Sequence, residues 1–410
     1  MSLPPLDLDF IRGQFPAFSE PSLDGWAFFE NAGGSYACKQ TIARLNDFYT
    51  LTKVQPYGPS PASATGGQLM DDAYVRLAGA MNFGQDEVHI GPSTSLKTYV
   101  LAHAFRQIWD DGDEISVTNQ DHEANSGVWR RLAVTGITVR EWQVDPETGT
   151  LDPADLSALF TDKTRLVAFP HVSNIVGHIN PVPEICELIA AAGAVSVVDG
   201  VSSAPHGLPD VSALGADIYL FSAYKTWGPH QGVMTVKRQV AHSLPNQSHF
   251  FNESYLRKKL LPAGPDHAQI AAMNGVVDYI DAAHEAHFED GAMPSDRAQR
   301  VHDLFRQTEI VLLTPLLDSL RDNPKARLLG PDDPITRVPT VALTTERNPA
   351  DIANELLESK IASDSGNFYA VRVLDAMGVP LDPGVLRLSF VHYTSPDEVS
   401  RLIDALAAAL

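Results

Sequence analysis

Cysteine is scarce in this sequence, and so are basic residues and long apolar runs. Only two of the 410 residues are cysteines, Cys38 and Cys186, which excludes a disulfide scaffold. Lys and Arg number 30 against 51 Asp and Glu, and the net charge of −21 would repel a nucleic acid. No run approaches the roughly 18 apolar residues of a membrane helix, and the acidic N-terminus is unlike a secretory signal. We therefore expect a cytoplasmic protein with neither nucleic acid nor membrane as a partner.

The length of the chain predicts two domains, because globular domains typically hold about 100–200 residues. In the first part, apolar segments alternate with helical ones; the apolar segments are 87–90, 114–118, 137–144, 165–170, 194–199, 217–222 and 232–237. Several lack strict apolar–polar alternation, which is typical of strands that are buried on both faces. The pattern predicts an α/β domain with a mostly parallel sheet covered by helices.

After about residue 268 the pattern changes to long helical stretches with a few short strands. Helices are predicted at 268–285, 294–320 and 396–410, and strands at 338–344 and 384–390. This α+β pattern predicts a smaller C-terminal domain. The predicted division is an N-terminal segment, 1–30, that packs on the small domain, a large domain of 31–268, and a small domain of 269–410. Residues 55–67 are rich in Pro, Gly and Ser and predict a loop.

Polar residues that follow the predicted strands are the first candidates for a site, because ligands in open α/β sheets bind beyond the carboxyl ends of strands. Asp199 ends one strand, where it could anchor a ring nitrogen or a metal, or cap the next turn. Lys225 and His122 follow two other predicted strands. Lys225 is either a functional group or a solvated charge on a loop, and His122 is either functional or structural. The segment 227–229, Trp-Gly-Pro, favours a fixed backbone, which suits a lysine that must not move freely.

Two further segments carry candidates for anion binding. Ser93 and Thr94 begin a predicted helix, where they either cap it or bind a phosphate. Arg387 lies on an apolar strand and needs an anionic partner from the protein or from a substrate. His171 and His178 have no carboxylate or thiol at ligand spacing, so we expect no metal site.

These segments, taken in their order along the chain, resemble those of the class V aminotransferases. This is the pyridoxal-5'-phosphate (PLP) fold-type I group that includes cysteine desulfurases. The resemblance runs from about residue 29 to residue 410. VVDGVSSAPH implies that Asp199 contacts the pyridine nitrogen, and FSAYKTWGPHQG implies that Lys225 carries PLP as a Schiff base. QDHEAN implies that His122 stacks on the cofactor ring. HVSNIVGHINP implies that Asn174 lies against the phenolic oxygen.

The resemblance also implies a phosphate site and a substrate site. PSTS is similar to the family's phosphate-binding turn, and the residues implied around the phosphate are Ser93, Thr94, Ser222 and Tyr224. Ser202 stands where the family often has a glutamine near the phenolic oxygen. LRLSFVHYTSPDEV implies that Arg387 binds the substrate carboxylate, and FFENAGG implies that Asn31 neighbours the substrate.

The departures from the family pattern bear on the reaction. Cysteine desulfurases use a nucleophilic cysteine on a loop of the second domain, and the corresponding SDSGNFYAVR, 363–372, has none. The family's Gly-Thr that reaches the partner's phosphate is Gly264-Pro265 here. The resemblance implies a homodimeric PLP enzyme that acts on a small amino acid, with aminotransferase chemistry preferred. A β-elimination lyase, a racemase and a non-catalytic PLP-binding scaffold are the alternatives.

Overall fold

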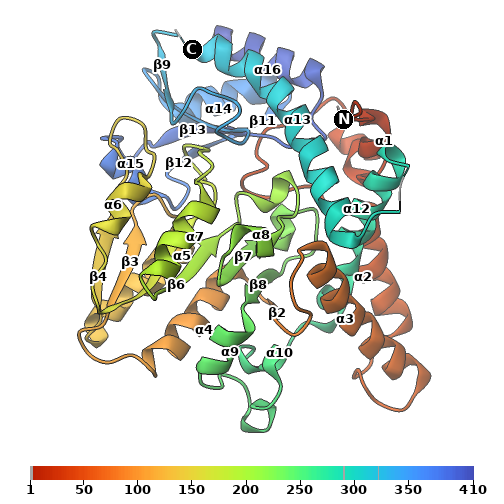
Figure 1. The fold of residues 1–410 in the computed structure, drawn as a ribbon. Helices are drawn as coiled ribbons and strands as arrows, with labels where there is room; N and C mark the ends of the chain where they lie inside the picture. Colours follow the sequence, from red (N-terminus) through yellow and green to blue (C-terminus); the bar gives the residue numbers. More distant parts are fainter. Residues whose placement is uncertain (1–2, 290, 322) are drawn as a thin grey trace.

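The computed structural model describes residues 3–289, 291–321 and 323–410, which form a seven-stranded sheet, a four-stranded sheet, a two-stranded sheet and their covering helices (Figure 1). The larger sheet has the strand order β2-β8-β7-β6-β5-β3-β4. Its strands are β2 (Val88–Gly91), β3 (Glu114–Thr118), β4 (Thr138–Trp142), β5 (Thr164–Pro170), β6 (Val195–Asp199), β7 (Ile218–Ser222) and β8 (Gly232–Val236). Strands β3 to β7 pair in parallel, whereas β8 is antiparallel to both its neighbours. The predicted mostly parallel sheet is confirmed.

Helices cover both faces of this sheet or pack on the helices that do so. They are α2 (Lys39–Leu51), α3 (Pro61–Ala80), α4 (Thr94–Arg106), α5 (Glu123–Arg131), α6 (Pro153–Ser157), α7 (Val182–Ala191), α8 (Val211–Leu214), α9 (Arg238–Ser243), α10 (Leu256–Lys259), α11 (His267–Ala272) and α12 (Asn274–His287). Along β5, Leu166 and Ala168 join one apolar core, while Val167 and Phe169 join the other. Because residues on both faces of the strand meet a core, this segment shows no apolar–polar alternation.

The second sheet has the antiparallel order β12-β13-β10-β9. Its strands are β9 (Ala326–Leu329), β10 (Thr340–Thr345), β12 (Asp364–Gly366) and β13 (Val385–Ser389). The helices of this part of the chain are α13 (Pro294–Arg321), α14 (Pro349–Glu358), α15 (Val371–Ala376) and α16 (Pro396–Ala409). Side chains of α13, α14 and α16 bury the same apolar core as Leu386 and Leu388 of β13.

The N-terminal segment contacts the second sheet and α12. After the short helix α1 (Leu8–Arg12), β1 (Ala27–Phe28) pairs in parallel with β11 (Ile361–Ala362). Phe15 packs edge-on against Tyr279 of α12, with ring centroids 5.1 Å apart. Helices α11 and α12 in turn pack against α2 and α3. The division at residues 30 and 268 stays a prediction.

The predicted loop at 55–67 is wrong in its second half, because α3 begins at Pro61. Ser60 caps the helix by accepting a hydrogen bond from the Ser63 amide, and a proline fits the first helical position. Gly66 and Gly67 lie inside the helix, where a Cβ on Gly67 would meet the ring of Tyr57 at 2.6 Å. Neither glycine forms a turn, and Gly67 serves close packing. Similarly, the helix predicted at 268–285 is two helices, α11 and α12. In the ranges described, no helix is long and apolar enough to cross a membrane.

Candidate functional site

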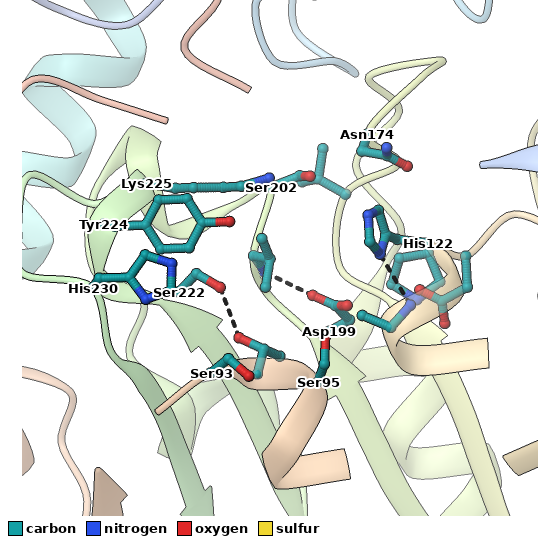
Figure 2. Close-up of a pocket in the computed structure, with 16 residues that line it drawn as sticks. Ser93, Ser95, His122, Asn174, Asp199, Ser202, Ser222, Tyr224, Lys225 and His230 are labelled. Atoms are coloured by element: carbon teal, nitrogen blue, oxygen red, sulfur yellow. Dashed lines mark hydrogen bonds between the residues drawn. The ribbon is translucent and has the colours of Figure 1, made fainter. Parts of the chain in front are cut away.

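A cavity of about 240 Å³ lies beyond the carboxyl ends of β6 and β7, next to the start of α4 (Figure 2). Residues from five separate strand ends and loops line it, because neighbouring parallel strands end at the same edge of the sheet. Nine of the residues singled out in the sequence are on its wall: Ser93, Thr94, His122, Asn174, Asp199, Ser202, Ser222, Tyr224 and Lys225.

Lys225 ends a single 3-10 turn that follows β7, and its amine points into this cavity (Figure 2). The Nζ atom donates a hydrogen bond to the backbone oxygen of Ala32 at 2.6 Å. The pKa of Lys225 is lowered to about 8: burial lowers it most and the positive charge of Arg387 also lowers it, while Asp199 and Glu30 act in the opposite direction. Lys225 is therefore deprotonated far more readily than an exposed lysine.

The backbone after Lys225 is held in an unusual conformation. Trp227 has a φ of +58° although it is not a glycine, and its side chain is fully buried. Its amide donates to the hydroxyl of Ser35 at 2.8 Å, and its ring packs edge-on against Tyr279 and Phe305. This packing stabilises the strained residue, and it gives the segment the fixed course that the sequence indicates.

Two buried carboxyl groups lie at the opposite end of the cavity. Asp199 Oδ1 accepts a hydrogen bond from the Val201 amide at 2.8 Å, and burial raises the pKa of its carboxyl group. Asp121 accepts from Asn125 Nδ2 at 2.7 Å, whereas its Oδ1 has no partner among the residues described. Burial and the charge of Asp199 raise the pKa of Asp121 well above its usual range. This end of the cavity is suited to a ligand atom that carries a proton or a positive charge.

His122 caps the N-terminus of α5. Its Nδ1 accepts a hydrogen bond from the Ala124 amide at 3.0 Å, so a neutral ring carries its proton on Nε2. Burial lowers the pKa of His122 to about 4, with Lys225 and Arg387 acting in the same direction. The ring is therefore neutral near pH 7 and offers a flat face to the cavity.

Hydroxyl groups and a helix start form a third part of the cavity wall. Ser93 caps α4, and the hydroxyl groups of Thr94 and Ser222 are 2.7 Å apart. The first turn of a helix leaves amide groups free to bind an anion. Strand β8 lies so close that a Cβ on Gly232 would meet the Ser93 carbonyl carbon at 2.4 Å. This end of the cavity is suited to a phosphate group.

The sequence reasoning missed three residues of the site. Asp121 lies beside His122 in the segment QDHEAN, so its position in the chain was a usable signal. His230 stacks on Tyr224 with ring centroids 4.6 Å apart and an interplanar angle of 7°. Glu30 belongs to a second cavity, and only the folded chain brings it there.

That second cavity, of about 550 Å³, shares Lys225 and His122 with the first and has Arg387 on its wall. Arg387 Nη2 lies 3.3 Å from Glu30 Oε1. Its guanidinium carbon lies 3.7 Å from the centre of the Phe368 ring. Burial lowers the pKa of Arg387 to about 10, so the side chain remains charged at neutral pH. A buried cation beside the lysine is suited to a carboxylate ligand.

Asn31 does not line either of these cavities. It lies in a smaller one, with Ser202 and Lys225, and its side chain makes hydrogen bonds within the protein. Asn31 Nδ2 donates to the backbone oxygens of Phe28 and Ser389, at 3.3 and 3.4 Å, and its Oδ1 accepts from the Tyr393 hydroxyl. In the structure Asn31 holds the N-terminal segment against β13, and its predicted contact with the substrate stays a prediction.

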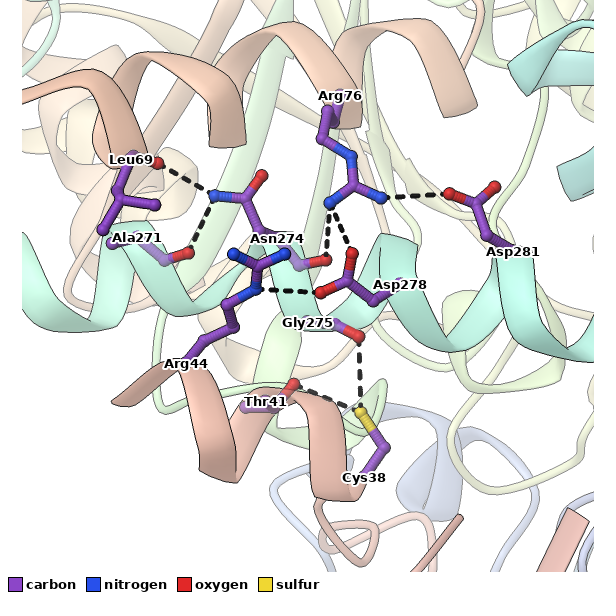
Figure 3. Close-up of polar contacts among 10 residues, drawn as sticks. All are labelled: Cys38, Thr41, Arg44, Leu69, Arg76, Ala271, Asn274, Gly275, Asp278 and Asp281. Carbon is purple, nitrogen blue, oxygen red and sulfur yellow. Dashed lines mark hydrogen bonds and ion pairs between the residues drawn. The ribbon is translucent and has the colours of Figure 1, made fainter. Parts of the chain in front are cut away.

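Both cysteines are buried away from these cavities. Cys38 Sγ contacts the hydroxyl of Thr41 at 3.3 Å and the backbone oxygen of Gly275 at 3.5 Å, where α2 meets α12 (Figure 3). Burial raises the pKa of the Cys38 thiol, and it raises that of Cys186, in α7, to about 11. Both thiols are therefore poor nucleophiles. Among the residues described, no three His, Cys, Asp or Glu side chains are grouped to hold a metal.

Residues 27–289 match the family described as aminotransferase class-V. This chain belongs to that family. It is 32% identical to the aminotransferase-like protein FGM3 of Gibberella zeae over the full length of both chains. It is also 28% identical to a cysteine desulfurase of Dickeya dadantii, over 97% of this chain and 96% of the other.

Solved structures confirm the fold. The cysteine desulfurase CsdA from Escherichia coli superposes with a TM-score of 0.83 at 22% identity, over 98% of each chain. A lysine-to-alanine variant of C-DES with glycine covalently linked to PLP superposes with a TM-score of 0.76 at 20% identity, over 97% of this chain and 98% of the other. The predicted PLP fold-type I architecture is confirmed.

Family membership identifies PLP as the cofactor. The donor set of the first cavity fits that molecule. It offers a buried amine for the aldehyde, a buried carboxyl for the ring nitrogen, and hydroxyl groups with a helix start for the phosphate. The Asp121 oxygen without a partner fits the same polar end of the ring.

Proposed function

We propose that this chain is a PLP-dependent enzyme that acts on a small amino acid, with aminotransferase chemistry. One observation supports this best: the cavity that holds Lys225 and Asp199 adjoins the cavity that holds Arg387. A cofactor and a carboxylate ligand would then meet at Lys225, which lines both cavities. The class-V aminotransferase family supports the same reaction type.

In this proposal the first cavity holds the cofactor. Lys225 would hold it covalently, Asp199 would accept a hydrogen bond from the protonated ring nitrogen, and His122 would lie with its neutral ring against the cofactor ring. Ser93, Thr94, Ser222 and Tyr224 would hold the phosphate, and Asn174 and Ser202 would lie near the phenolic oxygen. PLP supplies an electron sink for the bonds at the carbon that carries the amine.

The remaining steps belong to the chain's own groups. Arg387 binds the α-carboxylate and so orients the substrate's α-carbon towards Lys225. As a free amine beside the substrate's α-carbon, Lys225 would accept the α-proton and hold it for transfer. Its pKa of about 8 supports this role, because a general base works best when its pKa lies near the working pH.

A β-elimination lyase is the second candidate. Cysteine desulfurases are among the relatives of similar length, and elimination begins from the same deprotonated α-carbon. Residues 363–372 contain no cysteine, so we propose that any such reaction proceeds without a persulfide on this loop.

We also propose that the enzyme is a cytoplasmic homodimer. Large apolar side chains are exposed on and near the helices that pack on β2, among them Tyr57, Val75, Leu96 and Tyr99. An interface over these helices would remove these apolar side chains from water. Sedimentation of the holoprotein tests the dimer.

Product analysis tests the reaction. The holoenzyme is incubated with a panel of amino acids, with and without a keto-acid acceptor. Turnover that requires the acceptor supports transamination, whereas acceptor-independent release of pyruvate or ammonia supports the lyase. The absence of any change in the cofactor spectrum with every amino acid would contradict both and favour a non-catalytic scaffold.

A further inference from the structure

The guanidinium group that faces the second cavity already has an anionic partner within the chain. Arg387 is 4% exposed, and Glu30 Oε1 lies 3.3 Å from its Nη2. The Glu30 side chain is 28% exposed and lines the same cavity. On its other sides Arg387 is held by the ring of Phe368 and by the backbone oxygen of Asn174, 3.4 Å from Nη1. Of these contacts, only that with Glu30 involves an opposite charge.

The backbone around Glu30 is fixed, whereas its side chain is held weakly. Glu30 forms a parallel bridge with Ser389, and the amide of Asn31 donates to the Ser389 oxygen at 3.2 Å. Among the residues that the structure describes, the carboxyl group has one side-chain hydrogen bond, the 3.3 Å contact with Arg387. It turns back over Gly33, where a Cβ would lie 2.0 Å from Oε1. The side chain can therefore leave Arg387 without any change in the sheet.

We propose that Glu30 is a built-in competitor for the substrate carboxylate: it neutralises Arg387 in the free site and gives way when a carboxylate binds. This inference rests on the proposed function, in which Arg387 is the carboxylate-binding residue. A buried guanidinium without a partner is costly, so Glu30 stabilises the free site. The same contact lowers the affinity for every carboxylate ligand, because the ligand must displace it.

Displacement changes the charge balance around Glu30. The groups that face it are Arg387 on β13, Asp364 on β12, and Lys225 and Tyr224 on the turn after β7. Burial raises the pKa of Glu30 most, Asp364 adds to the increase, and Arg387 and Lys225 oppose it. A ligand carboxylate that pairs with Arg387 removes the cation that stabilises ionised Glu30. It also places a second negative charge beside Glu30, so the pKa of Glu30 rises further in the complex.

The direction of the pH effect follows from this rise. Because the complex favours protonated Glu30, binding of a carboxylate takes up a proton. The affinity is greatest at low pH, falls as the pH rises through the range between the two pKa values of Glu30, and is constant above it. Ligands without a carboxylate do not displace Glu30 and show no such dependence.

Calorimetric titration of the holoenzyme with propionate tests the proposal. Each protein is measured in two buffers of different ionisation enthalpy, on both sides of neutral pH, so that proton uptake is obtained without turnover. In the wild type we expect proton uptake that decreases towards alkaline pH. In Glu30→Gln we expect no uptake, and about fivefold tighter binding at alkaline pH, since one partly exposed ion pair no longer competes. Glu30→Ala provides a second variant with the same expected direction.

Two further variants separate the possible failures. Asp364→Asn removes a carboxyl that faces Arg387 without a hydrogen bond to it, and proton uptake should persist. Arg387→Gln should abolish propionate binding. If Arg387→Gln abolishes binding while both Glu30 variants bind like the wild type, the competitor role is wrong and the proposed function stands. If Arg387→Gln binds propionate normally, the carboxylate site itself is wrong, and this inference with it.

Discussion

Lys225 donates a hydrogen bond to the backbone oxygen of Ala32, 2.6 Å away, although 193 residues separate the two in the chain. Ala32 follows the segment that pairs with β11 and bridges to Ser389 of β13. The amine at the end of β7 is therefore in direct contact with a segment that is tied to the second sheet. A shift between the two sheets would change the position of Lys225. Because Lys225 lines both the first and the second cavity, the geometries of these two cavities are coupled.

The lowered pKa of Lys225 predicts the pH dependence of cofactor capture. Only the neutral amine attacks the PLP aldehyde, so the rate at which apoprotein captures PLP should rise with pH and level off above about 8. Stopped-flow absorbance measures this rate. Arg387→Met removes a positive neighbour and should move the midpoint to higher pH. A midpoint near that of an exposed lysine would show that the amine is not buried as described.

Replacement of Asp199 by asparagine should weaken PLP binding. The buried carboxylate is lost at the end of the cavity assigned to the ring nitrogen, and charge-assisted hydrogen bonds are the stronger ones. We expect affinity for PLP to fall about tenfold to hundredfold, measured by equilibrium dialysis. Asp86→Asn, which removes the partner of Arg238 on the surface, is the matched control and should leave affinity unchanged. Equal affinity of the Asp199 variant and the wild type would refute the ring-nitrogen role.

Gly232→Ala should perturb the phosphate end of the cavity. The new Cβ would lie 2.4 Å from the Ser93 carbonyl carbon and 2.5 Å from the Thr94 amide nitrogen, and backbone atoms cannot move aside cheaply. We expect the free energy of unfolding to fall by about 1–3 kcal/mol, together with a loss of affinity for PLP. Gly291→Ala, at a position with nothing within 4 Å, is the control. An unchanged affinity for PLP would show that this turn does not bind the phosphate.

Strands were the most predictable part of the fold. The segment EISVT matches β3 residue for residue, because a short apolar run between polar turns leaves few alternatives. The loop predicted at 55–67 failed for a non-local reason. Gly66 and Gly67 suggest a turn when read locally, but both lie inside α3, and Gly67 leaves room for the ring of Tyr57. That contact is not visible in the residues around them.

For the site, the sequence located the cofactor cavity better than the substrate cavity. Asp199 ends β6, while Lys225 and His122 follow β7 and β3, which run parallel to it in one sheet, so their meeting follows from topology. Glu30 reaches Arg387 only through the bridge to Ser389, which joins residues more than 350 positions apart. Such a register between distant segments cannot be read from composition or periodicity, and it accounts for the missed ion pair.

Identification of the residue that carries the cofactor is the most direct test of the central claim. Holoprotein is reduced with borohydride, digested, and its peptides are analysed by mass spectrometry. The predicted result is a single pyridoxyl group, on the peptide that contains Lys225, and its complete loss in Lys225→Ala. A pyridoxyl group on another lysine, such as the buried Lys97, or no modified peptide from cofactor-loaded protein, would contradict it.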